Sequence, residues 1–263
     1  MADGWYELSE MTSTEFADAL GEIRLGLVPV GATEQHGPNL ALGTDYVIAH
    51  RFAQRLAVRI HPLGVVVPPV AVGLSYHHSG FAGTLSLSPE TLIAICVDIA
   101  RALRDQGLTH ILFVNGHNGN NALLNVAATK IRYELGMPSA VAFWFQQASD
   151  VVKQGARTVR YGHACEIETS VLLALAPELV RRHSLEAGDM KPVRLEHAFN
   201  NQPFFHTVPV PFDEQTANGV FGDARLANRQ IGEQIVETAL TRSESFVRSF
   251  LNDGSAGQAG ASV

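Results

Sequence analysis

The chain has 263 residues, of which 46% are hydrophobic and 17% are charged, and its formal net charge at pH 7 is −7. That length suffices for one large α/β domain with a sizeable buried core. The acidic balance argues against a nucleic-acid partner, which would require a basic face, and no apolar run is long enough to cross a membrane.

Residues 1–20 contain several acidic side chains and no apolar stretch typical of a secretion signal. We therefore expect a cytoplasmic protein, and its two cysteines fit a reducing compartment. The segment Thr12–Glu15 predicts the start of a short amphipathic helix, because its hydroxyl groups can cap free backbone N–H groups.

Apolar runs alternate with amphipathic segments along the rest of the chain. The runs predict buried strands, and the segments with an apolar stripe at helical spacing predict helices. We expect strands at residues 24–30, 63–72, 110–114 and 139–145, and helices at 45–60 (capped by Asp45), 89–105, 121–135, 168–175 and 223–250. This alternation indicates βαβ units and a mainly parallel sheet, with reactive groups beyond the carboxyl ends of its strands.

The last third of the chain is less regular. Residues 190–215 are rich in proline, histidine and phenylalanine, which predicts a long ordered excursion or an interface element. Residues 251–263 are small, polar and rich in glycine, which predicts a disordered tail. Without a repeat or a convincing linker, we expect a single domain over residues 1–250.

The loop expected after the first strand, Gly31–Pro38, contains Glu34 and His36. In an extended segment these side chains point the same way, because they are two residues apart. They could bind one metal ion together, or one ion each with Asp45 between them. Carboxylate and imidazole ligands without thiolate suit zinc, manganese or a mixed pair, and one carboxylate can bridge two ions roughly 3.5–4 Å apart. The alternative is a solvated carboxylate and a capping histidine.

Two later segments carry similar side chains. His117 follows Gly116 after another expected strand, and Glu168 begins an apolar helix close to His163. Alone, His117 could be a hydrogen-bonded loop residue, and the helix dipole could favour Glu168 at a helix start. Cys165 is a weak candidate nucleophile, because nothing marks an oxyanion hole or an orienting group for it. Together with the first loop, the two segments favour a metal centre.

Three further polar residues could face a substrate. Asn118 could cap the next helix or donate a hydrogen bond to a substrate carbonyl group. The adjacent His77 and His78 project in different directions, so a place in the substrate pocket or in a subunit contact is favoured over metal ligation. The chain has no Walker loop and no Gly-x-Ser-x-Gly elbow, which argues against a nucleotide-binding protein and a serine hydrolase.

The segments Gly31–Pro38, Phe81–Thr84, Val114–His117 and Glu168–Ser170, together with Asp45, resemble the motifs of the creatininase (creatinine amidohydrolase) family. The resemblance extends over about residues 5–250. It implies a three-layer α/β/α sandwich, a two-metal centre with zinc or manganese, hydrolysis of a C–N bond and assembly into a homohexamer.

The resemblance also implies a role for each candidate residue. One ion would be bound by Glu34, Asp45 and His117. The second would be bound by His36, Asp45 and Glu168, so that Asp45 bridges the two ions. His163 corresponds to the histidine that shuttles protons near the scissile bond.

The chain departs from creatininase itself at two positions. The family's glutamate two residues after the Gly-His histidine is replaced by Gly119, which argues against creatinine as the substrate. Trp144 corresponds to one tryptophan of the creatinine pocket, but the second aligns near Val159, which cannot stack on a flat ring. Glu166 could assist proton transfer in place of the missing glutamate.

We therefore expect a binuclear metal-dependent amidohydrolase that cleaves a small, cyclic or planar amide and requires two divalent ions, Zn²⁺ and/or Mn²⁺. The expected catalytic residues are His163 and Glu166, and the expected substrate-pocket residues are His78, Asn118 and Trp144. The alternatives are a formamide hydrolase, a lactone or cyclic-ketone hydrolase, a peptidase of the mycofactocin-maturation type, and a metal-binding protein without turnover. The expected partners are the small-molecule substrate and further copies of the chain in a homo-oligomer.

Overall fold

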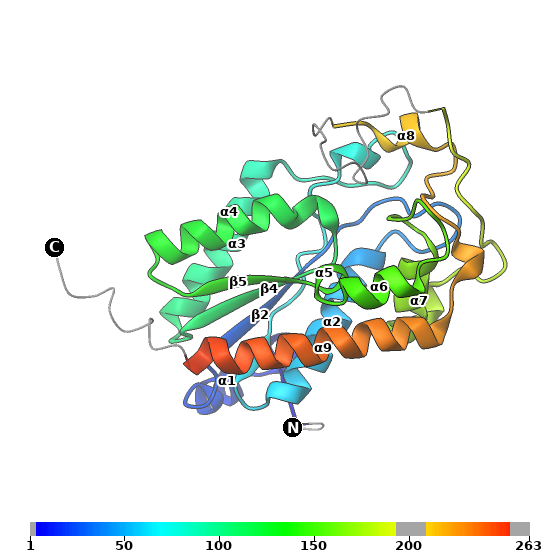
Figure 1. The fold of residues 1–263 in the computed structure, drawn as a ribbon. Coiled ribbons are helices and arrows are strands. Elements are labelled where there is room, and N and C mark those ends of the chain that lie inside the picture. The colour runs from blue at the N-terminus through cyan, green and yellow to red at the C-terminus, as the bar shows by residue number, and fades with distance from the viewer. Residues whose placement is uncertain (1–3, 193–208, 253–263) are drawn as a thin grey trace.

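The computed structural model describes residues 4–192 and 209–252. Within these residues, five parallel strands form one sheet in the order β1-β3-β2-β4-β5 (Figure 1). The strands are β1 (Tyr6–Glu7), β2 (Leu25–Val30), β3 (Gly64–Val66), β4 (His110–Asn115) and β5 (Ser139–Phe143). The predicted α/β fold with a parallel sheet is confirmed.

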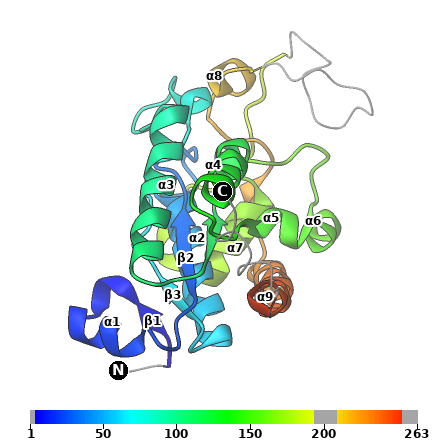
Figure 2. The same ribbon diagram turned by 90° about the vertical axis from the view of Figure 1, so that its left-hand side faces the viewer.

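Helices cover both faces of this sheet and complete the three expected layers (Figures 1 and 2). One face packs against α2 (Thr44–Ile60), α5 (Trp144–Gln147), α6 (Ser149–Gly155), α7 (Glu166–Leu175) and α9 (Arg229–Asn252). The other face packs against α1 (Ser13–Ala19), α3 (Pro89–Asp105) and α4 (Asn121–Glu134). The remaining helix, α8 (Phe212–Gln215), lies at the carboxyl end of the sheet.

The central strands β2 and β4 are buried over their whole length. They pair in parallel from Leu25 opposite His110 to Val30 opposite Asn115, so both strands end at the same level. Successive side chains of β4 point to opposite layers, with Leu112 in the core beneath α2 and Phe113 in the core beneath α3. The loops that follow β2 and β4 therefore start side by side.

Two strands are shorter than predicted. The expected strand at residues 63–72 ends at Val66 as β3, because Pro68 and Pro69 have no N–H to donate to a neighbouring strand. Pairing with β2 resumes beyond the prolines, where Val70 N donates to Pro29 O at 2.9 Å. The strand expected at 139–145 ends at Phe143, and Trp144 begins α5, since an apolar run does not reveal where a buried strand stops.

Most helix boundaries agree with the predictions, with α2 at Thr44–Ile60, α3 at Pro89–Asp105 and α4 at Asn121–Glu134. Thr12 forms a capping box with Glu15 at the start of α1, as its hydroxyl group suggested. The N-cap of α2 is Gly43 rather than Asp45, whose side chain lies in the first turn and faces inwards. The helix α9 spans Arg229–Asn252, so it starts six residues later than expected (229 − 223 = 6).

Most of the segment at 190–215 and the tail from residue 253 onward lie outside the described residues. The predicted excursion, single domain and disordered tail therefore stay predictions. In the described parts of the chain, none of the helices combines the length and the apolar character needed to cross a bilayer.

Two glycines allow the start of α2 to pack directly on the sheet. A Cβ atom at Gly31, after β2, would meet the backbone of Tyr46. A Cβ atom at Gly116, after β4, would meet the carbonyl group of Asp45. Only residues without a side chain permit this approach, and the approach places Asp45 between the two loops.

A third close approach generates a stability prediction. Gly232 of α9 packs against α7, where a Cβ atom would meet the carbonyl oxygen of Ser170. We expect Gly232→Ala to lower the free energy of unfolding by about 1–3 kcal/mol through overpacking, although alanine favours a helix by about 1 kcal/mol. Denaturant titration measures this change. The control is Gly21→Ala, where a Cβ atom has no neighbour within 4 Å; equal effects of the two substitutions would contradict the packing argument.

Candidate metal centre

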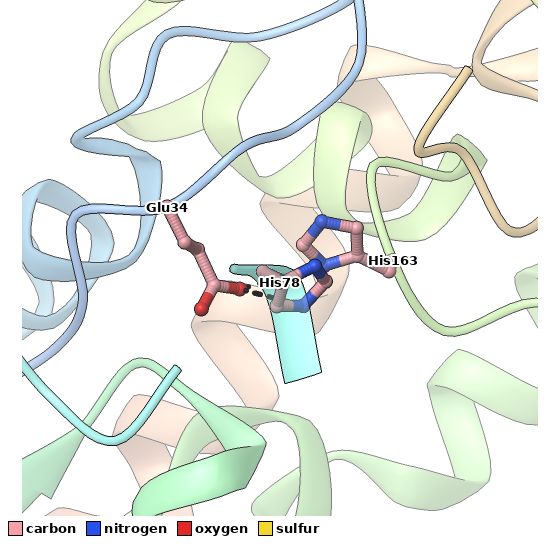
Figure 3. A group of neighbouring side chains, drawn as sticks. All are labelled: Glu34, His78 and His163. Carbon is pink, nitrogen blue, oxygen red and sulfur yellow. Dashed lines mark ion pairs between the residues drawn. The ribbon is translucent and has the colours of Figure 1, made fainter. Parts of the chain in front are cut away.

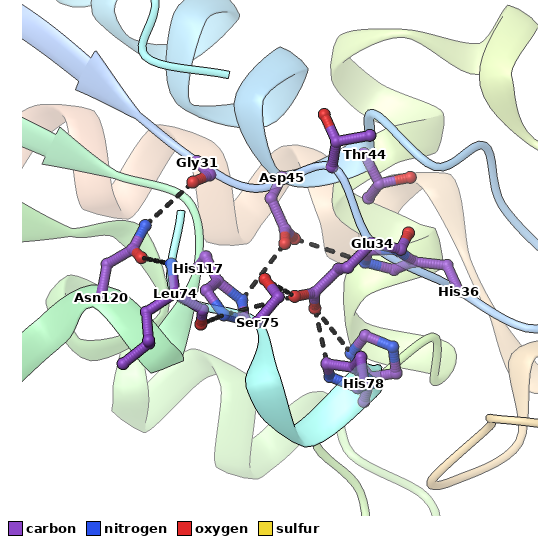
Figure 4. Close-up of polar contacts among 12 residues, drawn as sticks. Gly31, Glu34, His36, Thr44, Asp45, Leu74, Ser75, His78, His117 and Asn120 are labelled. Atoms are coloured by element: carbon purple, nitrogen blue, oxygen red, sulfur yellow. Dashed lines mark hydrogen bonds and ion pairs between the residues drawn. The ribbon is translucent and has the colours of Figure 1, made fainter. Parts of the chain in front are cut away.

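The candidate metal centre lies at the carboxyl ends of β2 and β4. After β2 the chain continues into α2 on one face of the sheet, and after β4 it continues into α4 on the other face, which is where open α/β sheets bind ligands. Five buried side chains from the loops after β2 and β4 and from the first turns of α2 and α7 meet at this point: they are Glu34, His36, Asp45, His117 and Glu168. Figure 4 shows the first four of them. The structure thus brings together all five residues that were predicted as metal ligands.

Asp45 lies in the middle of this cluster, and its two carboxylate oxygens face different imidazoles. Its Oδ1 is 3.3 Å from His36 Nε2, and its Oδ2 is 3.2 Å from His117 Nδ1. Glu34 lies on the side of His117, with Oε2 3.3 Å from His117 Nε2, and Glu168 lies on the side of His36, with Oε2 3.6 Å from His36 Nε2. A carboxylate with this orientation can serve two neighbouring cation positions.

Three atoms at the centre of the cluster are buried without a hydrogen-bond partner among the described residues: Glu34 Oε1, His36 Nε2 and Asp45 Oδ2. Buried acceptors that lack a partner are costly, so native structures almost always satisfy them. Ligand atoms of these same three residues lie within 4.8 Å of one another. A divalent cation would satisfy all three, and carboxylate and imidazole donors suit zinc or manganese.

Backbone carbonyl groups orient three of the imidazoles. Glu34 O lies 3.1 Å from His36 Nδ1, Leu74 O lies 3.0 Å from His117 Nε2, and Gln35 O lies 2.7 Å from His163 Nε2. Because a carbonyl oxygen only accepts, each of these nitrogens carries the hydrogen and the opposite nitrogen keeps its lone pair. The lone pairs of His36 Nε2 and His117 Nδ1 then face Asp45, as metal ligation requires.

The electrostatics of the cluster favour positive charge. Burial raises the pKa of Glu34 to about 7, whereas the imidazoles of His36 and His117 outweigh burial and lower the pKa of Asp45. Burial alone would lower the pKa of His117, but Glu34 and Asp45 raise it to about 9. The carboxylates therefore attract protons to the imidazoles, at the positions where a metal ion would otherwise balance the charge.

Glu166 and Glu168 both lie in the first turn of α7, yet their carboxylates contact different groups. Glu168 Oε2 accepts a hydrogen bond from Ala164 N at 2.6 Å and faces His36. Glu166 instead accepts hydrogen bonds from Arg157 N, Thr158 N, Thr158 Oγ1 and Asp223 N, and it does not line the cavity at the cluster. The carboxylate of Glu166 thus anchors two loops to α7, and its part in proton transfer stays a prediction.

A cavity of about 170 Å³ opens beside the cluster, and its wall includes Asp45, His117, His163 and Glu168. The three predicted substrate-pocket residues, His78, Asn118 and Trp144, line this cavity. Aromatic rings form much of the remaining wall, contributed by Phe143, Phe145 and Phe212. The cavity is small for a ligand site, so it suits a compact, flat molecule.

Three residues that shape the site were not predicted from the sequence. Ser75 Oγ donates to Glu34 Oε2 at 2.6 Å. Asn120 accepts a hydrogen bond from Leu74 N and donates one to Gly31 O, both at 2.9 Å. It therefore holds the backbone of Leu74, whose carbonyl oxygen orients His117. Phe212 of α8 packs against His78 with ring centroids 4.2 Å apart. The asparagine-rich loop hinted at Asn120, but no local pattern identifies Ser75 or Phe212.

Gly119 lies directly against one of the candidate ligands. A Cβ atom there would meet His117 Nε2, and it would come within 2.6 Å of Leu74 O. Any side chain at this position would therefore disturb the hydrogen bond that orients His117. In this backbone conformation the loop cannot accept the glutamate that the resemblance led us to look for.

Comparisons with known proteins identify a family of similar chains. The profile described as "Creatininase: Creatinine amidohydrolase" matches residues 9–247. Its span covers all the residues of the candidate metal centre and the cavity wall.

Individual relatives are similar over most of their length. The mycofactocin precursor peptide peptidase of Mycobacterium ulcerans (strain Agy99) is 34% identical over 194 residues, which cover 71% of this chain and 71% of that protein. The creatinine amidohydrolase of Pseudomonas putida is 30% identical over 232 residues, covering 81% of this chain and 85% of that protein. The solved structure "Creatininase Mn" has a TM-score of 0.75 and 26% identity, and the match covers 93% of this chain and 98% of that one.

The two glutamates of α7 provide a matched test of the centre. We expect Glu168→Gln to weaken the binding of divalent metal, since it removes a charged ligand that faces His36. Glu166→Gln should keep full metal binding but lower the free energy of unfolding by about 1–3 kcal/mol, because several partly buried donors lose a charged acceptor. Metal analysis and denaturant titration of both variants check this. Metal loss in Glu166→Gln with retention in Glu168→Gln would reverse the two assignments.

Proposed function

Because the chain belongs to the creatininase family, we propose that it is a hydrolase with a binuclear metal centre that cleaves an amide C–N bond of a small substrate. The observation that carries this proposal is a set of three buried atoms at one end of the sheet that have no hydrogen-bond partner in the described parts of the chain: Glu34 Oε1, His36 Nε2 and Asp45 Oδ2. The manganese form of creatininase among the similar solved structures supports the choice of metal.

The positions of the carboxylates support two ion sites that share Asp45. Glu34, Asp45 and His117 would hold one ion, and His36, Asp45 and Glu168 would hold the other. When bound, divalent ions in such a centre lower the pKa of water and polarise a carbonyl group. The chain's own contribution is to keep the five side chains together in a buried recess that contains three carboxylates.

His163 is the proposed proton carrier. Its Nε2 hydrogen is held by Gln35 O, so the lone pair of Nδ1 faces the centre, 3.7 Å from Glu34 Oε1. Burial and the nearby His36 lower its pKa, which keeps the imidazole neutral and able to accept a proton from the attacking water. His163 then passes this proton to the departing nitrogen, and general acid–base catalysis of this kind contributes roughly 10²–10⁴-fold.

The cavity supports a small planar or cyclic amide other than creatinine. Trp144 and Phe212 provide flat apolar walls, while the position that corresponds to the second creatininase tryptophan does not face the cavity. Val159 is 88% exposed and is absent from the cavity wall. The close contact at Gly119 excludes the loop glutamate as well.

A peptidase is the second candidate. The loss of both creatinine-pocket features is the observation that favours it, together with the similarity to the mycofactocin precursor peptide peptidase of M. ulcerans. Its scissile bond would also be an amide, so the same five ligands and His163 would serve. A formamide hydrolase or a lactone hydrolase would retain this centre too. A cytoplasmic homohexamer stays a prediction.

The bridging role of Asp45 can be tested by metal analysis. We expect the purified protein to carry about two equivalents of transition metal and Asp45→Ala to lose both, because each oxygen of Asp45 faces one proposed ion site. Thr44→Val is the control, since Thr44 lies at the start of α2 but donates to Ala41 O instead. Full metal content in Asp45→Ala, or equal loss in Thr44→Val, would contradict the bridging role.

The class of substrate can be tested with protein stripped by a chelator and reloaded with manganese or zinc. We expect metal-dependent hydrolysis of small cyclic amides, no hydrolysis by the stripped protein, and a loss of turnover of roughly 10²-fold or more in His163→Asn. The panel includes creatinine, formamides, lactones and short peptides, with product analysis by mass spectrometry. Cleavage confined to peptides would select the second candidate, and inertness towards the whole panel would contradict both.

A further inference from the structure

Two neighbouring imidazoles, tilted relative to each other, approach the same carboxylate oxygen at the edge of the candidate metal centre. His78 Nε2 lies 3.2 Å and His163 Nδ1 lies 3.7 Å from Glu34 Oε1 (Figure 3). The angle between the two ring planes is 30°, and their centroids lie 4.3 Å apart. Both could therefore serve as ligands or as proton carriers, and the nitrogen that carries the hydrogen decides which role each can have.

The side-chain amide of Gln35 has a fixed orientation. Its Oε1 accepts a hydrogen bond from Gly37 N at 2.8 Å, and its Nε2 donates to Gly219 O at 3.1 Å. A backbone N–H only donates and a carbonyl oxygen only accepts. In the alternative amide orientation, the NH₂ group of Gln35 would therefore face the N–H of Gly37, and its oxygen would face the carbonyl oxygen of Gly219. The second hydrogen of Gln35 Nε2 is therefore available to His78 Nδ1, which lies 2.8 Å away.

It follows that His78 and His163 present opposite groups to the centre, one an N–H and the other a lone pair. Its Nδ1 accepts from Gln35, so its hydrogen resides on Nε2, the nitrogen that faces Glu34. His163 donates its Nε2 hydrogen to Gln35 O and turns a lone pair towards the same oxygen. His78 therefore has no lone pair for a metal ion at Nε2, whereas His163 presents one at Nδ1.

The Nε2 hydrogen of His78 is not used by Glu34. Although the two atoms lie 3.2 Å apart, Glu34 Oε1 has no hydrogen-bond partner among the described residues. His78 also lines the cavity, where its ring contacts the rings of both His163 and Phe212. An N–H group in this position can meet an oxygen atom of a molecule that enters the cavity.

We propose that His78 is a neutral hydrogen-bond donor to the carbonyl oxygen of the amide substrate, and that Gln35 is a positioning residue that sets its tautomer. This inference rests on the proposed hydrolase function and adds a second group to the chemistry of the site. As water adds to the carbonyl carbon, negative charge grows on the carbonyl oxygen and strengthens a hydrogen bond from Nε2. The hydrogen stays on His78, and the proton that reaches the leaving nitrogen travels through His163.

The tautomer can be measured independently of turnover. We expect ¹⁵N NMR of the zinc-loaded protein with labelled histidine to show a neutral His78 with its hydrogen on Nε2. His78→Gln assigns the resonances by their disappearance. In Gln35→Glu, a carboxylate can only accept, so the hydrogen should move to Nδ1. A hydrogen on Nδ1, or on both nitrogens, in the wild-type protein would overturn the proposal.

Kinetics of the same variants test the role of the donor. We expect His78→Leu to lower kcat by roughly 10²–10³-fold, with a small change in KM and unchanged metal content. His78→Gln should recover part of this loss, because its amide N–H can reach the position of Nε2. His50→Gln is the matched control, since His50 lies outside the centre and contacts Glu7; its kcat should equal that of the wild type.

The outcomes separate this inference from the function on which it rests. A wild-type protein that hydrolyses amides while His78→Leu retains full kcat would overturn the donor role alone. Loss of metal from His78→Leu would show that His78 is a ligand and would also overturn it. Absence of amide hydrolysis by the metal-loaded wild-type protein would instead overturn the proposed function, whichever tautomer His78 adopts.

Discussion

The packing of the start of α2 on the ends of two central strands is the constraint on which the site depends. Gly31 and Gly116 permit this contact, because a Cβ atom at either would strike the backbone of Asp45 or Tyr46. The contact inserts Asp45 between the loops that carry Glu34 and His117. The central carboxylate is therefore positioned by backbone packing within the core, and its place does not depend on long side chains or on exposed loops.

The loops that supply the ligands also supply the acceptors that orient them. Glu34 provides a carboxylate and, through its carbonyl oxygen, holds the ring of His36. Gln35 holds His163 through its carbonyl oxygen and His78 through its amide nitrogen. One residue thus gives two neighbouring imidazoles opposite hydrogen-bonding characters, which matches the proposed division of proton transfer and charge stabilisation between them. The path of a single loop determines both.

Much of the fold and the outline of the site could be predicted from sequence, because both follow from local patterns. Glu34, His36 and His117 directly follow buried apolar runs, and parallel strands bring such residues to one edge. The pair in α7 shows what was overlooked: Glu166 and Glu168 are two residues apart on a helix, so they cannot face the same way. Pro68 and Pro69 were a second overlooked signal, because two prolines predict that β3 ends before them. Phe212 and the Gln35–Gly219 contact could not be predicted, since they join segments far apart in sequence.

The aromatic part of the cavity wall and the proposed ion-binding frame come from different parts of the fold. Strands β2 and β4 and the first turns of α2 and α7 provide the frame, whereas α5 and α8 add Trp144 and Phe212. Evolution could therefore exchange the recognition surface piece by piece while the inherited frame persists. Such an exchange would explain why relatives of this chain include both a creatinine amidohydrolase and a peptide peptidase.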